Sequence, residues 1–113
     1  MALAKINRLS KEKDIKNVFS KGKTIKGGFF FIRFLKNGLV SSRIAVMVPK
    51  KVSKKAVERN LIKRRIYESL EKKYLQKNGL DILIVTLPTI LEKPFKEIKA
   101  EIDKTTKILF GQT

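Results

Sequence analysis

Apolar residues recur at helical spacing in three segments of this chain. Residues 10–20 predict a first helix, whose apolar face consists of Ile15, Val18 and Phe19. Residues 53–77 predict a long second helix, with an apolar stripe at Ile62, Ile66, Leu70 and Tyr74. Residues 94–111 predict a third, with a buried face at Phe95, Ile98, Ile102 and Leu109. Ser10 and Ser53 are the expected N-caps of the first two helices.

A period of two, or a continuous apolar run, marks the strands. Residues 29–35 predict a strand in which one face carries Phe30, Ile32 and Phe34 and the other Phe29, Phe31, Arg33 and Leu35. The sequence leaves open which of these faces lies in the core. Residues 42–49 predict a second strand. Pro49 lacks an N–H, so it either ends this strand or lies at an edge of the sheet. Residues 80–87 are almost entirely apolar and predict a central strand.

These elements indicate one α+β domain over residues 1–113, in the order α-β-β-α-β-α. Strand-like structure is expected from about residue 24, and residues 1–9 are expected to form a loosely ordered basic lead-in. We predict a two-layer sandwich with a small sheet on one side and the helices on the other. The helix between two strands becomes a crossover connection if those strands are parallel neighbours.

The charge of the chain points to a polyanionic partner. The 27 lysines and arginines outnumber the 10 acids, which gives a net charge of +17 and a pI of about 10.3. An anionic membrane is the rival partner, but no strongly apolar amphipathic helix and no run of ~20 apolar residues is present. No secretory signal begins the sequence, so a cytoplasmic protein is expected.

Catalytic chemistry is hard to find in this composition. The chain contains no cysteine and no histidine, which excludes thiolate chemistry and removes the commonest general base. The acids lie mostly on lysine-flanked helical faces, and neither a P-loop nor a Gly-x-Gly-x-x-Gly motif occurs. We therefore expect no catalytic residue on this chain.

The strongest signal is a basic run at the start of the second helix. Cations there oppose the helix dipole, so a bound polyanion is the simplest reason for them. A scattered lysine surface is the alternative, yet the arginines are fixed on a helix, and an amide among them can bond a ribose or base edge. The predicted interface consists of Lys50, Lys51, Lys54, Lys55, Arg59, Asn60, Lys63, Arg64 and Arg65. On the first strand, the neighbouring Phe31 and Arg33 could stack unpaired bases or simply pack beneath a helix.

The order of these motifs resembles the protein component of bacterial ribonuclease P over nearly the whole chain. Residues 8–22 are similar to the opening helix of that family, and the phenylalanine-rich strand follows. Residues 50–65 are the most specific part, where a lysine run precedes Ala-Val, Arg-Asn and Ile-Lys-Arg in fixed order. The chain departs from the family pattern at Ile15, Pro49, Leu61 and Tyr67. Leu61 replaces a second signature arginine.

The resemblance implies a function and a set of contacts. The basic interface would bind the catalytic RNA, and a cleft between the first helix and the sheet would hold the 5′ leader of precursor tRNA. The residues that map to this cleft are Ile15, Phe19, Phe31 and Arg33. Leader removal would depend on Mg²⁺ held mainly by the RNA, and the fold would contain a left-handed βαβ crossover.

Two other functions remain open at this point. A small basic ribosomal-type RNA-binding protein, with no role in cleavage, explains the charge equally well. A DNA-binding helix-turn-helix is weaker, because no second helix lies three or four residues before the basic helix.

Overall fold

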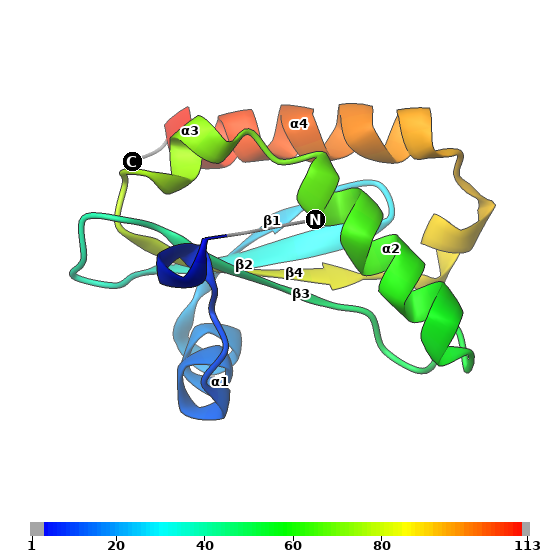
Figure 1. Ribbon diagram of the computed structural model, residues 1–113, viewed down its shortest axis with the longest axis horizontal. Helices are drawn as coiled ribbons and strands as arrows, with labels where there is room; N and C mark the ends of the chain where they lie inside the picture. Colours follow the sequence, from blue (N-terminus) through cyan, green and yellow to red (C-terminus); the bar gives the residue numbers. More distant parts are fainter. Residues whose placement is uncertain (1–3, 112–113) are drawn as a thin grey trace.

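The computed structural model describes residues 4–111 and shows a mixed α+β fold (Figure 1). This class and the order of the main elements confirm the prediction. The elements are η1 (Lys5–Asn7), α1 (Glu12–Lys21), β1 (Lys23–Lys26), β2 (Phe30–Lys36), β3 (Arg43–Met47), α2 (Ala56–Glu68), α3 (Lys72–Leu75), β4 (Leu80–Thr86), η2 (Pro88–Glu92) and α4 (Phe95–Gly111). No helix in this described part of the chain is long and apolar enough to cross a bilayer.

Four strands form one mixed sheet in the order β1-β2-β4-β3. β2 pairs antiparallel with β1 and with β4, whereas β3 and β4 are parallel neighbours. All seven residues of β4 are buried, which confirms the prediction of a central strand. The chain leaves β3 and returns to β4 through α2 and α3, so the predicted crossover is present. Its left-handed sense stays a prediction from the family resemblance.

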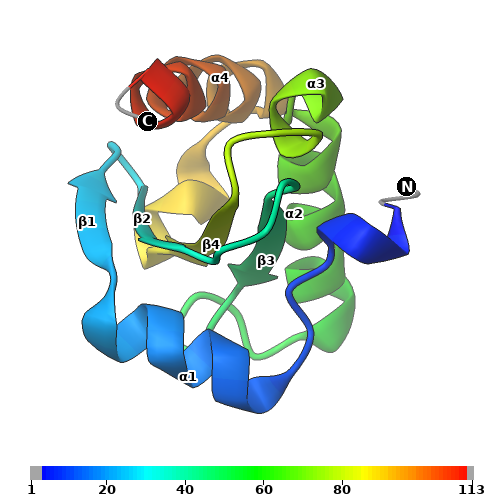
Figure 2. The same cartoon turned by 90° about the vertical axis from the view of Figure 1, so that its left-hand side faces the viewer.

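The helices are divided between the two faces of the sheet, as Figures 1 and 2 show. α2, α3 and α4 cover the face that carries the larger core, with Phe30 and Ile32 of β2 fully buried. α1 packs on the opposite face, where Val18 is 0% exposed and clusters with Leu83 of β4. The predicted two-layer arrangement is therefore wrong where α1 lies. Both faces of β2 are apolar, and burying both requires helices on both sides.

The strand-face question is answered for β2. Phe31 and Leu35 pack against the α1-side cluster, and Phe30 and Ile32 belong to the main core. Phe29 departs from the predicted alternation, because it precedes the first residue of β2. Its ring packs edge to face on Phe30 in the main core, with the two centroids 5.5 Å apart.

The predicted helix over residues 53–77 is wrong in its length, because α2 ends at Glu68 and a separate turn of helix, α3, follows. The Ser69 hydroxyl donates to the carbonyl of Arg65 at 2.7 Å, so a side chain occupies one of the carbonyls at the C-terminal end of α2. After this bend the Tyr74 ring stacks on Phe110 of α4, with centroids 5.0 Å apart. Neither predicted serine cap forms: the N-cap residues of α1 and α2 are Lys11 and Lys55, without side-chain cap bonds.

The N-terminal lead-in is better ordered than predicted, although residues 1–3 lie outside the described part. Asn7 is 2% exposed and donates to the carbonyls of Ser42 and Leu75, at 2.8 and 2.7 Å. Arg8 forms a parallel bridge with Ile44 of β3. These bonds fasten η1 to the edge of the sheet and to α3, since a buried amide is stable only when its donors are satisfied.

Candidate nucleic-acid interface

The basic loop before α2 is anchored from within. Val52 and Ser53 are buried, so the four lysines around them point outward and are exposed. The Ser53 hydroxyl accepts a bond from the Lys55 backbone N–H at 3.2 Å, and Arg59 donates to the Ser53 carbonyl at 3.0 Å. Arg59 thus ties the loop to the first turns of the helix, and part of its donor capacity is used inside the protein.

The solvent side of α2 continues this basic loop. Ile62 and Ile66 are buried against the sheet, which leaves Asn60 and Arg64 exposed and Lys63 half-buried. Within residues 4–111, the side chains of Asn60, Lys63 and Arg64 make no hydrogen bond and no ion pair. We call the whole set the basic ridge: Lys50, Lys51, Lys54, Lys55, Arg59, Asn60, Lys63 and Arg64. No carboxylate of the described chain neutralises it.

Arg65 and Tyr67, which follow on α2, lie outside the basic ridge. The Arg65 guanidinium lies 5.8 Å from the centre of the Phe95 ring, at the start of α4, so its place in the RNA interface stays a prediction. Tyr67 is half-buried and packs against the main core. Burial raises the pKa of Tyr67 above its ordinary value of 10.0, and the phenol stays neutral at physiological pH.

A second candidate surface is an apolar hollow beside α1. It has a volume of about 480 Å³ and is lined by Ile15, Lys16, Phe19, Ser20 and Met47. We call this hollow the α1 groove. Phe19 is 48% exposed and Met47 37%, so two large apolar side chains face solvent there. Val18, which precedes Phe19 in α1, is buried against the sheet and anchors the helix there.

The four predicted leader residues lie on the same side of the sheet, but only two line the hollow. Ile15 and Phe19 line it, and Phe31 lies half-buried in the cluster beneath α1. Arg33 lies beside them, with its guanidinium 5.7 Å from the centre of the Phe19 ring. Met47, which also lines the groove, was not predicted from the sequence. Its only signal was a large apolar side chain at the end of an edge strand.

Arg33 is held by the hairpin that follows α1. Its two terminal nitrogens donate to the Thr24 hydroxyl and the Gly22 carbonyl, both at 2.7 Å, while its Nε is buried without a partner. Gly22 ends α1 as predicted, and the reason is close packing. A Cβ there would lie 2.5 Å from the Val18 carbonyl and 2.9 Å from that of Phe34. Arg33 therefore binds the C-terminal end of α1.

A second arginine holds the other end of α1. Arg43 of β3 donates two bonds to Asp81 of β4, at 2.7 and 2.6 Å, and lies 3.5 Å from a carboxylate oxygen of Asp14 in α1. Asn37 donates to the same Asp81 carboxylate at 3.0 Å. Hydrogen bonding to Asp81 raises the pKa of Arg43 above its ordinary value, so the pair stays charged. Together Arg43 and Arg33 fix α1 over the sheet.

The net charge is unevenly divided along the chain. Residues 1–67 contain 19 lysines and arginines and three acids, a net +16. Residues 68–113 contain eight lysines and seven acids, a net +1. The second part supplies α3 and α4, which lie together at one side of the molecule in Figures 1 and 2. The positive field therefore originates from the rest of the surface, which includes α1 and the basic ridge.

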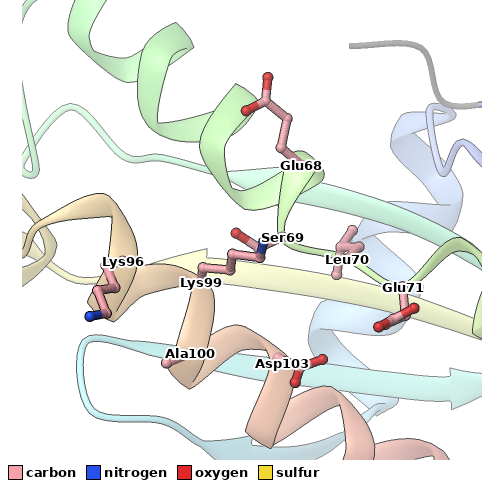
Figure 3. Close-up of a pocket in the computed structure, with 8 residues that line it drawn as sticks. All are labelled: Glu68, Ser69, Leu70, Glu71, Lys96, Lys99, Ala100 and Asp103. Carbon is pink, nitrogen blue, oxygen red and sulfur yellow. The ribbon is translucent and has the colours of Figure 1, made fainter.

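The near-neutral side contains a mixed-charge pocket of about 430 Å³, between the end of α2 and α4 (Figure 3). Glu71 and Asp103 border it together with Lys96 and Lys99, and the Lys99 side chain extends toward Ser69. Asp103 is paired with Lys107 at 3.1 Å. Residues 4–111 contain no group of three acidic side chains arranged to hold a metal ion.

The chain is similar to known proteins along almost its whole length. A family model described as Ribonuclease P matches residues 3–109. The ribonuclease P protein component of Caldanaerobacter subterraneus subsp. tengcongensis is 35% identical over 106 residues, which cover 91% of this chain and 89% of the relative. That of Alkaliphilus oremlandii is 35% identical over 98 residues, 86% of this chain and 85% of the relative.

Solved structures show the same fold. The ribonuclease P protein of Thermotoga maritima, in complex with 1-(4-fluorophenyl)-2-thiourea, is 27% identical with a TM-score of 0.73, covering 84% of this chain and 92% of that one. A Staphylococcus aureus ribonuclease P protein mutant with defective mRNA degradation activity is 24% identical, with a TM-score of 0.82, covering 93% and 89%.

The fold and the one-sided charge define a small α+β protein that works with RNA. The chain belongs to the ribonuclease P protein family, and it is the protein component of that metal-dependent, tRNA-processing endoribonuclease. The match along the whole chain does not favour the ribosomal-type alternative.

Proposed function

We propose that this chain binds the catalytic RNA of ribonuclease P through the basic ridge and the 5′ leader of precursor tRNA through the α1 groove. It thereby promotes Mg²⁺-dependent endonucleolytic removal of the leader, in the cytoplasm. The observation that carries the proposal is the set of exposed and half-buried cations on α2 and its preceding loop, none of which is paired with a carboxylate within residues 4–111.

The basic ridge suits a folded RNA backbone. Arg64 can form bidentate bonds to a phosphate, and lysines such as Lys54 act as mobile point charges around it. The buried Val52 and the bond from Arg59 to Ser53 hold the loop, so less side-chain and backbone entropy is lost on binding. Released counterions favour the complex most strongly at low salt.

The α1 groove suits a single strand rather than a duplex. Unstacked bases can pack against Phe19 and the apolar side chains of Ile15 and Met47. The Arg33 guanidinium beside Phe19 extends this flat surface. Met47 precedes Lys50 by only three positions, so the chain leads directly from the lining of the groove to the first lysine of the basic ridge. A leader in the groove and a catalytic RNA on the ridge can then be bound at once.

The chain assists chemistry that takes place on the RNA. Two polyanions must approach each other, and a protein of net charge +17 between them lowers their repulsion. Mg²⁺ supplies Lewis-acid activation for hydrolysis when it is bound, and we propose that RNA phosphates provide most of its ligands. The residues of this chain bind and orient, and they discriminate substrate from product because mature tRNA lacks the leader.

Leader removal at low Mg²⁺ tests the proposal. Catalytic RNA of this enzyme class is incubated with precursor tRNA, with and without the protein, and cleavage is followed over time. We expect faster cleavage with the protein and a smaller Mg²⁺ requirement. Equal rates with and without the protein would refute the proposed function.

Arg64→Ala tests the ridge in a separate binding measurement, in which affinity for the catalytic RNA is determined over a range of salt concentrations. It should weaken binding of the catalytic RNA and lower the slope of log K against log salt by about 0.9, the value for one phosphate contact. Lys104→Ala on α4 is the matched control, since it removes one exposed cation from the near-neutral side. An unchanged slope for Arg64→Ala would remove Arg64 from the interface.

A further inference from the structure

An apolar groove lies in the middle of the basic ridge. Its lining residues are Val57, Asn60, Leu61 and Arg64, which share one face of α2 because they are spaced by three, four and seven positions. The groove has a volume of about 420 Å³. Val57 is 82% exposed, the most exposed large hydrophobic residue of the described chain. We call this hollow the α2 groove.

An apolar floor does not suit a phosphate. A phosphate placed over Val57 and Leu61 would lose hydration without gaining a donor from either side chain. The helix surface around them is nonetheless built for RNA, with Lys54, Lys55 and Lys63 close by in sequence and Arg64 at the groove itself. The occupant must therefore combine an apolar face with attached negative charge.

An unpaired nucleotide has this combination. Its base offers a flat apolar face, its edge offers hydrogen-bond donors and acceptors, and its phosphate offers charge. Asn60 can both donate and accept, as a base edge requires, and Arg64 can reach a flanking phosphate. Both side chains are without a hydrogen bond or ion pair within residues 4–111, so neither must give up an internal partner.

We propose that the α2 groove binds one unpaired nucleobase of the catalytic RNA, with Val57 and Leu61 against its face and Asn60 on its edge. This rests on the proposed function, since it needs the basic ridge to contact that RNA. It adds that the ridge reads a single exposed base and does not only neutralise a backbone. Bases in a continuous A-form helix are stacked and paired, so the groove selects a bulge or a loop.

Base-specific chemical probing of the complex tests the inference. The catalytic RNA is treated with dimethyl sulfate for adenine and cytosine and with a carbodiimide for uracil and guanine, with and without the protein. Hydroxyl-radical cleavage reports backbone contacts in parallel. The proteins compared are wild type, Asn60→Ala and Leu61→Arg. Both substitutions are at exposed or half-exposed positions of α2, and circular dichroism checks that each variant is folded.

The wild type should protect at least one unpaired base about fivefold. Asn60→Ala and Leu61→Arg should restore its reactivity to within about twofold of free RNA, while the backbone footprint elsewhere remains. Leu61→Arg is the sharper variant, because it adds a cation. On a phosphate it would tighten binding and raise the salt slope by about 0.9, whereas on a base it should weaken binding about tenfold.

Two results would overturn the inference while leaving the proposed function intact. One is tighter binding and a steeper salt slope for Leu61→Arg. The other is a base-reactivity pattern that is identical for all three proteins while the backbone footprint is present. Absence of any footprint with the wild type would instead refute the proposed function itself, and the inference with it.

Discussion

Arg33 is the residue whose role the structure changes most. It was expected to contact the leader, yet both of its terminal nitrogens are bonded within the protein, to Thr24 and to the end of α1 at Gly22. Its guanidinium also lies 5.7 Å from the centre of the Phe19 ring. Arg33 therefore positions α1 and Phe19 beside the α1 groove. If the groove binds the leader as we propose, Arg33 acts mainly by holding Phe19 in place and less by its charge.

The magnitude of Arg33→Met follows from these contacts. Two bonds from a charged donor contribute about 3 kcal/mol together, and the cation–π contact about 0.5 kcal/mol. The substitution also removes the buried Nε, which lacks a hydrogen-bond partner, and this stabilises the fold by about 1 to 2 kcal/mol. The free energy of unfolding should fall by about 2 kcal/mol, and Tm by about 8 °C for a domain of this length. Arg33→Lys keeps the charge but cannot bridge both acceptors, and it should lose at least half as much.

Two measurements separate positioning from charge. Thermal unfolding by circular dichroism gives the stability loss, and holoenzyme affinity for tRNA with and without a leader gives the discrimination. Both variants should reduce discrimination about fivefold with an unchanged salt slope. The reasoning fails if Arg33→Lys discriminates like wild type while Arg33→Met loses about 0.9 of the slope, since Arg33 would then act on a phosphate.

Other substitutions test the packing around the site. Arg43→Met leaves the Asp81 carboxylate, 9% exposed, without its main partner, so urea denaturation should show a loss of about 3 kcal/mol, and adding Asp81→Leu should recover part of it. Ile66→Ala opens a cavity at a residue that is 0% exposed and should cost about 3 kcal/mol. Val57→Ala, at an exposed position, should change stability by less than about 0.5 kcal/mol. Because burial raises the pKa of Tyr67, the unfolded chain ionises first, so stability should fall as pH rises above 10.0. Tyr67→Phe should remove that alkaline loss when unfolding is compared at about pH 9 and pH 11.

The alternation of side chains along the sequence predicted the strands well, because it depends only on neighbouring residues. The pattern of β2 separated Phe30 and Ile32 from Phe31 and Arg33, as the structure confirms. It could not say that both sets are covered, since that depends on where α1 packs. The position of α1 is decided by Val18 and by partners distant in sequence.

Local signals were less reliable at the helix ends. A serine hydroxyl can cap a helix or bond the backbone of a nearby turn instead. The Ser53 hydroxyl accepts a hydrogen bond from the Lys55 N–H, which precedes the first residue of α2. After the bend, Tyr74 of α3 stacks on Phe110 of α4, which is 36 positions away. No window of sequence around residue 69 contains that contact.

The candidate site also contains some features that local sequence predicts and others that depend on contacts distant in sequence. The basic ridge follows from helical geometry, so Asn60, Lys63 and Arg64 lie together as predicted. Arg65 was assigned to the interface from charge alone, and its guanidinium lies 5.8 Å from the centre of the Phe95 ring at the start of α4. The bond between Arg43 and Asp81 spans 38 positions, and pairing of β3 with β4 creates it. Such contacts become visible only when the sheet order is known.

Two double variants of equal charge test whether RNA binds one side of the molecule. Lys54→Ala with Lys55→Ala removes two exposed cations from the basic ridge, and Lys99→Ala with Lys104→Ala removes two from α4. Both lower the net charge of +17 by the same amount. Affinity for the catalytic RNA is measured from low to high salt. The ridge variant should lose about 1.8 of the log–log slope, and the α4 variant should keep the wild-type slope. Equal losses from the two variants would show that the positive charge acts without direction, which contradicts a defined interface on α2 and its loop.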